Sequence, residues 1–275
     1  SNPTVACVEE KISSLEGGCG ALLTSSGQAA SLIAVMNICS AGDHIVSSST
    51  IYGGTFNLFA VTLKRYGIDF TFVAPDASED ELEKAFKPNT KAVFGETIAN
   101  PVLSVLDIEK FAEAAHRHNV PLIVDNTFAT PILCRPFEHG ADIVTHSTSK
   151  YMDGHAMVLG GVIVDSGKFD WTKGNFPGLT KPDESYHGII YTESFKNAAY
   201  ITKARVQLMR DLGATPAPIS AFLLNIGLET LHLRVQRHCE NALRVAEFLE
   251  NNPKISWVNY PMLESTKYYS NAKRY

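Results

Sequence analysis

His146-Ser147-Thr148-Ser149-Lys150-Tyr151 follows the apolar run Ala141-Asp142-Ile143-Val144-Thr145, and this run predicts a buried strand. Lys150 therefore falls just beyond the carboxyl end of a strand, which is where open α/β sheets place their ligands. Hydroxyl side chains precede the lysine and glycines follow it. We interpret Lys150 as an amine nucleophile that forms a Schiff base, although a lysine chosen at random is more often an ordinary loop residue.

A second predicted strand, residues 120–124, ends in Asp125-Asn126-Thr127. A carboxylate at the end of one strand and an amine after the next are the pair that pyridoxal phosphate (PLP) requires. The aspartate keeps the pyridinium nitrogen protonated, so that the ring withdraws electrons, and the lysine carries the aldehyde carbon. Asp125 and Lys150 together therefore favour a PLP site.

A candidate anion site lies near the amino end of the chain. Ser25-Ser26-Gly27-Gln28 precedes a predicted helix over residues 29–39, and the first amides of a helix are unsatisfied donors at its positive end. Serine and glycine are also ordinary capping residues, so the pattern alone does not decide between the two interpretations. The glycine spacings of nicotinamide and nucleoside triphosphate sites are absent, which disfavours both of those classes.

Two further residues after predicted strands are candidates for contact with a planar cofactor. Tyr52 precedes Gly53-Gly54 and could lay its ring over the cofactor, or it could be a half-buried loop tyrosine. Asn100 precedes Pro101 at the exit of the strand predicted over residues 91–97. Its amide could reach the cofactor's phenolic oxygen, or it could only form a turn.

Strands alternate with helices from residue 21 to residue 165, which predicts an α/β fold: a mostly parallel sheet with helices on both faces. Helices are predicted over residues 195–212, 216–226 and 229–249. A new strand is predicted over residues 255–260. We therefore expect a large domain over residues 1–250 and the start of a smaller C-terminal α+β domain over residues 251–275.

Composition limits the functional classes. The 275 residues carry a net charge of −5 with no basic stripe, which argues against nucleic acid or an acidic membrane surface as partner. The five cysteines are scattered without a C-x-x-C pair, so neither a disulfide framework nor a zinc site is expected, and a reducing cytoplasm is the simplest location. His116 and His118 are two apart on a predicted helix and cannot face one metal together. No apolar run approaches the length of a membrane span, so we expect a soluble protein.

Five motifs in order resemble the Cys/Met-metabolism family of PLP enzymes. They are Ser26-Gly27-Gln28-Ala29, Tyr52-Gly53-Gly54, residues 96–101, residues 125–131 and residues 146–151. The resemblance implies the fold-type I PLP transferase fold, with Lys150 as the Schiff-base lysine, Asp125 on the pyridine nitrogen and Tyr52 stacked on the ring. It also implies contacts of Asn100 with the phenolic oxygen. The Gly27 and Gln28 amides and the Ser147 and Ser149 hydroxyls would bind the phosphate, and Ser26 would be a further cofactor-binding residue.

Several segments outside these motifs, among them Met209-Arg210-Asp211-Leu212-Gly213, resemble the branch of the family that transfers sulfur in methionine biosynthesis. This implies a transferase that performs γ-replacement, in which O-acetyl-L-homoserine and sulfide give L-homocysteine and acetate. Methionine γ-lyase and cystathionine γ-synthase activities are the alternatives, and a non-catalytic subunit with the same fold is a more remote one. A serine hydrolase is disfavoured because no G-x-S-x-G elbow is present.

The sequence departs from the family pattern at both ends. A Tyr-x-Arg motif that serves a neighbouring subunit would be expected before Ser1, and an arginine for the substrate carboxylate would be expected after Tyr275. We therefore expect that the sequence belongs to a longer protein. The same motif implies a homo-oligomer, most simply a tetramer built from dimers.

Overall fold

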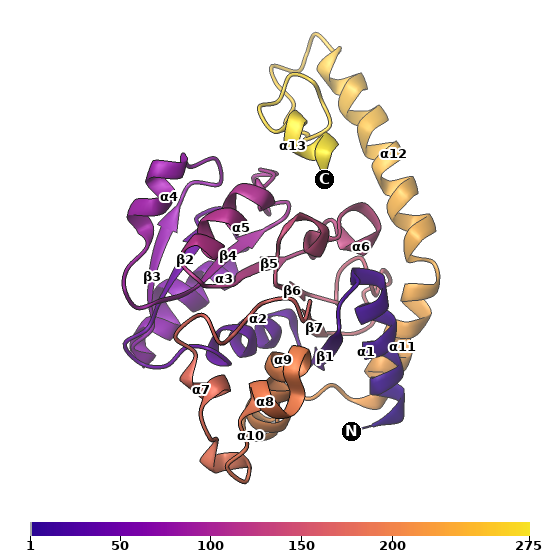
Figure 1. Cartoon of the computed structure of the whole chain (residues 1–275). Coiled ribbons are helices and arrows are strands. Elements are labelled where there is room, and N and C mark those ends of the chain that lie inside the picture. Colours follow the sequence, from indigo (N-terminus) through magenta and orange to yellow (C-terminus); the bar gives the residue numbers. More distant parts are fainter. Residues whose placement is uncertain (1) are drawn as a thin grey trace.

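The computed structural model describes residues 2–275, and one seven-stranded sheet forms its centre (Figure 1). The strand order is β1-β7-β6-β5-β4-β2-β3, in which β6, β5, β4, β2 and β3 are parallel and β7 is antiparallel to both neighbours. The prediction of a mostly parallel α/β sheet is therefore confirmed. The strands are β1 (Gly20–Thr24), β2 (His44–Ser48), β3 (Asp69–Val73), β4 (Thr90–Glu96), β5 (Leu122–Asp125), β6 (Ile143–His146) and β7 (Gly161–Asp165).

Helices cover both faces of the sheet. In Figure 1, α5 (Ile108–Arg117) lies on one side of the strands, and α2 (Gly27–Met36) and α9 (Ala199–Lys203) lie on the other. Strands β4, β6 and β7 are buried along their whole length, which explains why their sequences are runs of apolar residues rather than alternating patterns.

The remaining helices connect the strands or follow the sheet. Those before β7 are α1 (Pro3–Glu16), α3 (Gly53–Asn57), η1 (Leu58–Thr62), η2 (Leu63–Tyr66), α4 (Glu79–Ala85), α6 (Thr130–Leu133) and η3 (Pro136–His139). Those after β7 are α7 (Pro177–Thr180), η4 (Glu184–Tyr186), α8 (Tyr191–Phe195), η5 (Lys196–Ala198), η6 (Ala204–Met209), α10 (Arg210–Leu212), α11 (Pro218–Glu229), α12 (Leu231–Glu250) and α13 (Tyr269–Arg274). Within residues 2–275, none of these helices combines the length and the apolar character that crossing a bilayer requires.

One predicted element is wrong, and one predicted helix contains a break. Residues 255–260 form no strand, because no neighbouring strand offers them hydrogen bonds; instead the segment after α12 turns back, and Asn259 Nδ2 donates to the Val102 carbonyl at 2.8 Å. The single helix predicted over residues 195–212 is interrupted, since α8 ends at Phe195 and Lys196 adopts φ +50° before the chain becomes helical again. The division into domains at residue 250 stays a prediction.

The strand directions bring several chain segments to one edge of the sheet. Because β2, β4, β5 and β6 are parallel, their carboxyl ends meet at the same edge. Strand β1 is antiparallel to β7, which is antiparallel to β6, so the carboxyl end of β1 also lies at that edge. The anion-site motif after β1 and the lysine motif after β6 therefore lie on the same side of the molecule.

Candidate active site

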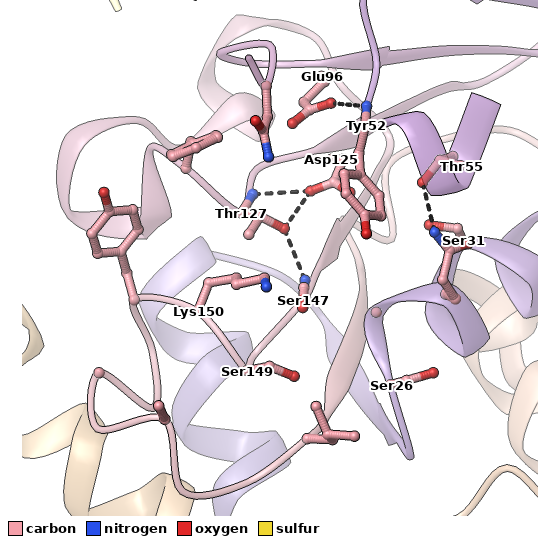
Figure 2. A pocket seen from close by; sticks show the side chains of 18 of the residues that line it. Ser26, Ser31, Tyr52, Thr55, Glu96, Asp125, Thr127, Ser147, Ser149 and Lys150 are labelled. Atoms are coloured by element: carbon pink, nitrogen blue, oxygen red, sulfur yellow. Dashed lines mark hydrogen bonds between the residues drawn. The ribbon is translucent and has the colours of Figure 1, made fainter. Parts of the chain in front are cut away.

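A cavity of about 540 Å³ opens at this edge of the sheet (Figure 2). The structure brings together every residue that the sequence indicated as a site residue, and all of them line this cavity. They are Ser26, Gly27, Gln28, Tyr52, Asn100, Asp125, Ser147, Ser149 and Lys150. The cavity also contains residues that sequence reasoning missed, among them Glu96, Thr127, Arg234 and His238.

Lys150 lies in the turn that follows β6. Its backbone N–H donates to the Ser147 carbonyl at 3.3 Å, and its own carbonyl accepts from Gly154 N at 2.8 Å. The side chain runs along the cavity, and Figure 2 shows its amine directed toward the region between Asp125 and Ser147. An amine in this position can attack a carbonyl carbon of a molecule in the cavity.

Arg234 of α12 holds the chain just after the lysine. Its Nη1 donates to the Tyr151 carbonyl at 2.7 Å, and its Nη2 donates to the Gly227 carbonyl at 2.7 Å. Gly154 lies so close that a Cβ there would be 2.3 Å from Arg234 Nη1. The arginine therefore connects the lysine turn to α11 and restrains the position of that turn.

Asp125 is the last residue of β5, and a local turn fixes its carboxylate. Asp125 Oδ1 accepts from Thr127 N at 3.0 Å and from Thr127 Oγ1 at 2.5 Å (Figure 2). The same threonine hydroxyl accepts from Ser147 N at 2.8 Å, which connects the ends of β5 and β6. Burial raises the pKa of Asp125, while the Thr127 hydrogen bonds and the charge of His146 act in the opposite direction. A cationic group in the cavity would stabilise the ionised form of this partly buried carboxyl group.

The amino end of α2 forms the anion-binding side of the cavity. Ser26 caps the helix, because its Oγ accepts from Ala29 N at 3.1 Å. The backbone N–H groups of Gly27 and Gln28 are the first two of the helix and have no acceptor within it. A Cβ on Gly27 would lie 2.6 Å from Ser147 Cβ, so only glycine allows this close approach of α2 to the lysine motif. Ser149 lines the same cavity, and its hydroxyl accepts from Gly160 N at 2.9 Å, which fixes the position of the side chain. The arrangement suits a phosphate group.

Tyr52 stands at the mouth of the cavity with 48% of its surface exposed. Its backbone N–H donates to Glu96 Oε2 at 2.6 Å. Gly54 leaves room for the tyrosine ring, because a Cβ there would lie 2.6 Å from the ring. An exposed, well-positioned ring beside a cavity can cover a flat ligand.

Glu96 is the main residue of the site that was missed. It pairs with Asp125 in the parallel register of β4 and β5, and it is 5% exposed. Burial, together with the neighbouring Asp125 carboxylate, raises the pKa of Glu96 to about 9. The signal was present in the sequence, because Glu96 ends the strand next to the one that carries Asp125. At neutral pH we expect Glu96 to hold a proton.

Replacing Glu96 by glutamine is expected to stabilise the protein increasingly as pH rises. Between the ordinary pKa of 4.5 and the folded value of about 9, the unfolded chain ionises while the folded chain keeps its proton. The wild-type free energy of unfolding therefore falls with pH, by at most about 1.4 kcal/mol per pH unit. Glutamine does not ionise, so the free energy of unfolding of the variant lacks this decrease with pH. Denaturant unfolding of the cofactor-free proteins across pH 5 to 8 tests this, and parallel curves for the two proteins would show that Glu96 is ionised when folded.

The two histidines near the end of α5 pair with carboxylates. His116 Nε2 lies 2.8 Å from Asp142 Oδ2, and His118 Nε2 lies 2.7 Å from Glu83 Oε2. Within residues 2–275, no cluster of three or more histidine, cysteine, aspartate or glutamate side chains is arranged to hold a metal ion.

Comparison with known sequences and structures shows the relatives of this chain. The family model described as Cys/Met metabolism PLP-dependent enzyme matches residues 1–275. The homocysteine/cysteine synthase of Saccharomyces cerevisiae is 50% identical over 277 residues, which cover 100% of this chain and 62% of that protein. The O-acetyl-L-homoserine sulfhydrylase of Leptospira meyeri is 47% identical over 283 residues, covering 100% of this chain and 64% of that protein.

A solved structure gives the same result for the fold. The structure of a putative O-acetylhomoserine (thiol)-lyase from Campylobacter jejuni, which contains a pyridoxyl-lysine monophosphate, has a TM-score of 0.95 and 40% sequence identity. The match covers 100% of this chain and 68% of that one. The chain thus spans somewhat less than two thirds of the two curated relatives described above.

Proposed function

Because the chain belongs to the Cys/Met metabolism family of PLP-dependent enzymes, we propose that it acts on O-acetyl-L-homoserine and sulfide and gives L-homocysteine and acetate. The observation that carries this proposal is the single cavity in which Lys150, Asp125 and the amino end of α2 converge. Relatives at 47 to 50% identity that are named for this chemistry support the choice of reaction.

The residues present fit PLP. Lys150 offers an amine for the aldehyde carbon, Asp125 offers a carboxylate for the pyridine nitrogen, and the amides of Gly27 and Gln28 offer donors for the phosphate. Tyr52 offers a ring for stacking, and Asn100 lines the cavity within the same site. When bound, PLP withdraws electrons from the carbon next to the substrate nitrogen, which makes loss of a proton there possible.

The residues of the chain supply binding and proton transfer. Lys150 Nζ would hold the cofactor, and its amine, when free, would take protons from Cα and Cβ of the substrate and return them as the product forms. The negative charge of Asp125 would favour a proton on the ring nitrogen of the bound cofactor. Glu96 and Thr127 keep the tyrosine backbone and the aspartate in place through the hydrogen bonds at 2.6 and 2.5 Å. Over the whole reaction, the Cγ–O bond to acetate is exchanged for a Cγ–S bond.

Purified protein supplied with PLP tests the reaction directly. With O-acetyl-L-homoserine and sulfide, we expect formation of homocysteine and acetate in equal amounts. With methionine alone, or with an activated homoserine and cysteine, we expect turnover at least about tenfold slower, which corresponds to about 1.4 kcal/mol in the transition state. Faster turnover of methionine would favour a γ-lyase, and faster formation of cystathionine would favour a cystathionine γ-synthase. Absence of any cofactor absorbance would favour a non-catalytic subunit.

We further propose a cytoplasmic homotetramer built from dimers. The five cysteines are all free, which suits a reducing compartment. Apolar side chains of α11 and α12 are exposed, with Phe222 at 51% and Leu233 at 60%, which suits contact with another subunit. Light scattering of the purified protein measures the assembly, and a monomeric mass would contradict it.

A further inference from the structure

Glu16 is a buried carboxylate that lies behind the cofactor cavity and does not line it. It is the last residue of α1, and 1% of its surface is exposed. Its Oε1 accepts from His146 Nε2 at 2.5 Å and from Asn126 Nδ2 at 3.1 Å. One carboxylate oxygen therefore joins two residues that are 20 positions apart in the chain.

Each of these two partners is next in sequence to a residue that lines the cavity. Asn126 follows Asp125, and His146 precedes Ser147. Asn126 is fully buried, and it also donates from Nδ2 to the Cys134 carbonyl at 2.8 Å and accepts from Thr97 Oγ1 at 2.8 Å. The backbone ladder between β5 and β6 extends to Asn126, whose N–H donates to the Thr145 carbonyl at 2.9 Å. Side chains add two connections beyond this ladder, through Thr127 on the cavity side and through Glu16 on the opposite side.

Glu16 and His146 are both buried, and burial of polar atoms without hydrogen-bond partners costs free energy. Glu16 Oε2 and His146 Nδ1 have no hydrogen-bond partner among residues 2–275, and His146 is 1% exposed. A buried pair with unsatisfied atoms contributes little to stability, and replacement by apolar residues is often neutral or stabilising. Such a pair is therefore better explained by the geometry or charge that it imposes on the site than by stability. The charge of His146 also lowers the pKa of Asp125, against the effect of burial.

We propose that Glu16 is a positioning residue for the cofactor, because it fixes Asp125 and Ser147 relative to one another through Asn126 and His146. This inference rests on the proposed function, since Asp125 and Ser147 would hold the ring nitrogen and the phosphate. Loss of Glu16 would leave His146 Nε2 without its acceptor and would remove one of the two acceptors of Asn126 Nδ2. The backbone ladder would keep β5 and β6 paired, but the side chains that set the positions of Asp125 and Ser147 at the strand ends would be less restrained.

The variants Glu16→Ala and Glu16→Gln test the proposal. Alanine removes the acceptor, and we expect the Kd for PLP to rise on the order of tenfold and the visible circular dichroism of the bound cofactor to change. Glutamine keeps an oxygen that accepts both hydrogen bonds, and we expect it to restore most of the affinity. If the alanine variant does not fold, Glu16→Asp decides, because a side chain shorter by one methylene group keeps the carboxylate but cannot reach both donors. Its Kd for PLP should then rise, and wild-type affinity with unchanged dichroism in this variant would contradict the positioning role.

Glu9 provides a matched control on the same helix. It is 5% exposed, its Oε1 accepts from Leu23 N at 2.8 Å, and its Oε2 pairs with Arg205 at 2.7 Å. Glu9→Gln should lower the melting temperature without a change in Kd or dichroism. If wild-type protein binds no PLP, the proposed function fails and this inference with it. If wild type binds PLP and both Glu16 variants bind it equally well with unchanged dichroism, the positioning role alone is wrong.

Discussion

The Lys150→Ala variant is expected to lose turnover and the visible absorbance of covalently attached cofactor. Alanine has no amine, so the cofactor cannot be attached and the proton transfers at Cα and Cβ have no carrier. General acid–base catalysis alone contributes about 10²–10⁴-fold, and loss of attachment adds to this, so we expect a decrease of at least about a thousandfold. Steady-state assays measure the first effect. Borohydride reduction followed by peptide mass analysis measures the second.

Lys173 provides the control for loss of a lysine. Its side chain is 71% exposed and pairs with Asp170 at 3.6 Å on the surface. Lys173→Ala should keep full activity and full absorbance, because exposed ion pairs contribute little. Full activity in Lys150→Ala would contradict the assigned role, and borohydride labelling of another lysine in wild type would move the role to that residue.

The candidate site could be predicted from the sequence because strand ends carry its residues. Asp125 ends β5, Lys150 follows β6, and Ser26-Gly27 follows β1. In a parallel sheet such ends meet at one edge, so local patterns were enough to place distant residues together. The antiparallel strand β7 does not change this. Because β7 is antiparallel to both β6 and β1, these two strands point in the same direction, and their carboxyl ends lie at the same edge.

Residues that reach the cavity from helices could not be predicted in the same way. Arg234 and His238 belong to α12, more than 80 positions after the lysine motif. The apolar stripe of this helix indicates that one face is buried, but it does not indicate which strand ends the polar residues meet. Their positions depend on how α11 and α12 pack, which is a property of the tertiary structure.

The wrong strand over residues 255–260 has a related cause. The segment contains Ile255, Trp257 and Val258, which have high strand propensity. Strand propensity needs a partner strand to become structure, and residues 2–275 provide none beside this segment. The segment instead lies beside the loop between β4 and α5, where Asn259 Nδ2 donates to the Val102 carbonyl at 2.8 Å.

The Asp125→Asn variant is expected to lose activity while it keeps or gains stability. Asparagine retains an oxygen that accepts from Thr127 N and Thr127 Oγ1, so the turn after β5 should persist. Because burial raises the pKa of Asp125, ionisation of this residue costs the folded state stability above the ordinary value of 3.8, and the neutral amide avoids that cost. The free energy of unfolding of the cofactor-free variant at neutral pH should therefore equal or exceed that of wild type.

Activity should change in the opposite direction, because the amide carries no charge to keep the cofactor ring protonated. Removal of one preorganised electrostatic contact typically costs about 10²–10³ in kcat, and we expect a loss of that size. Asp142 is the matched control: it is 4% exposed, burial raises its pKa, and it lies at the opposite edge of the sheet beside His116. Asp142→Asn should affect unfolding and leave kcat nearly unchanged. If Asp125→Asn instead lowered stability and kept kcat, the aspartate would only cap the turn, and the cavity would need another group to protonate its ligand.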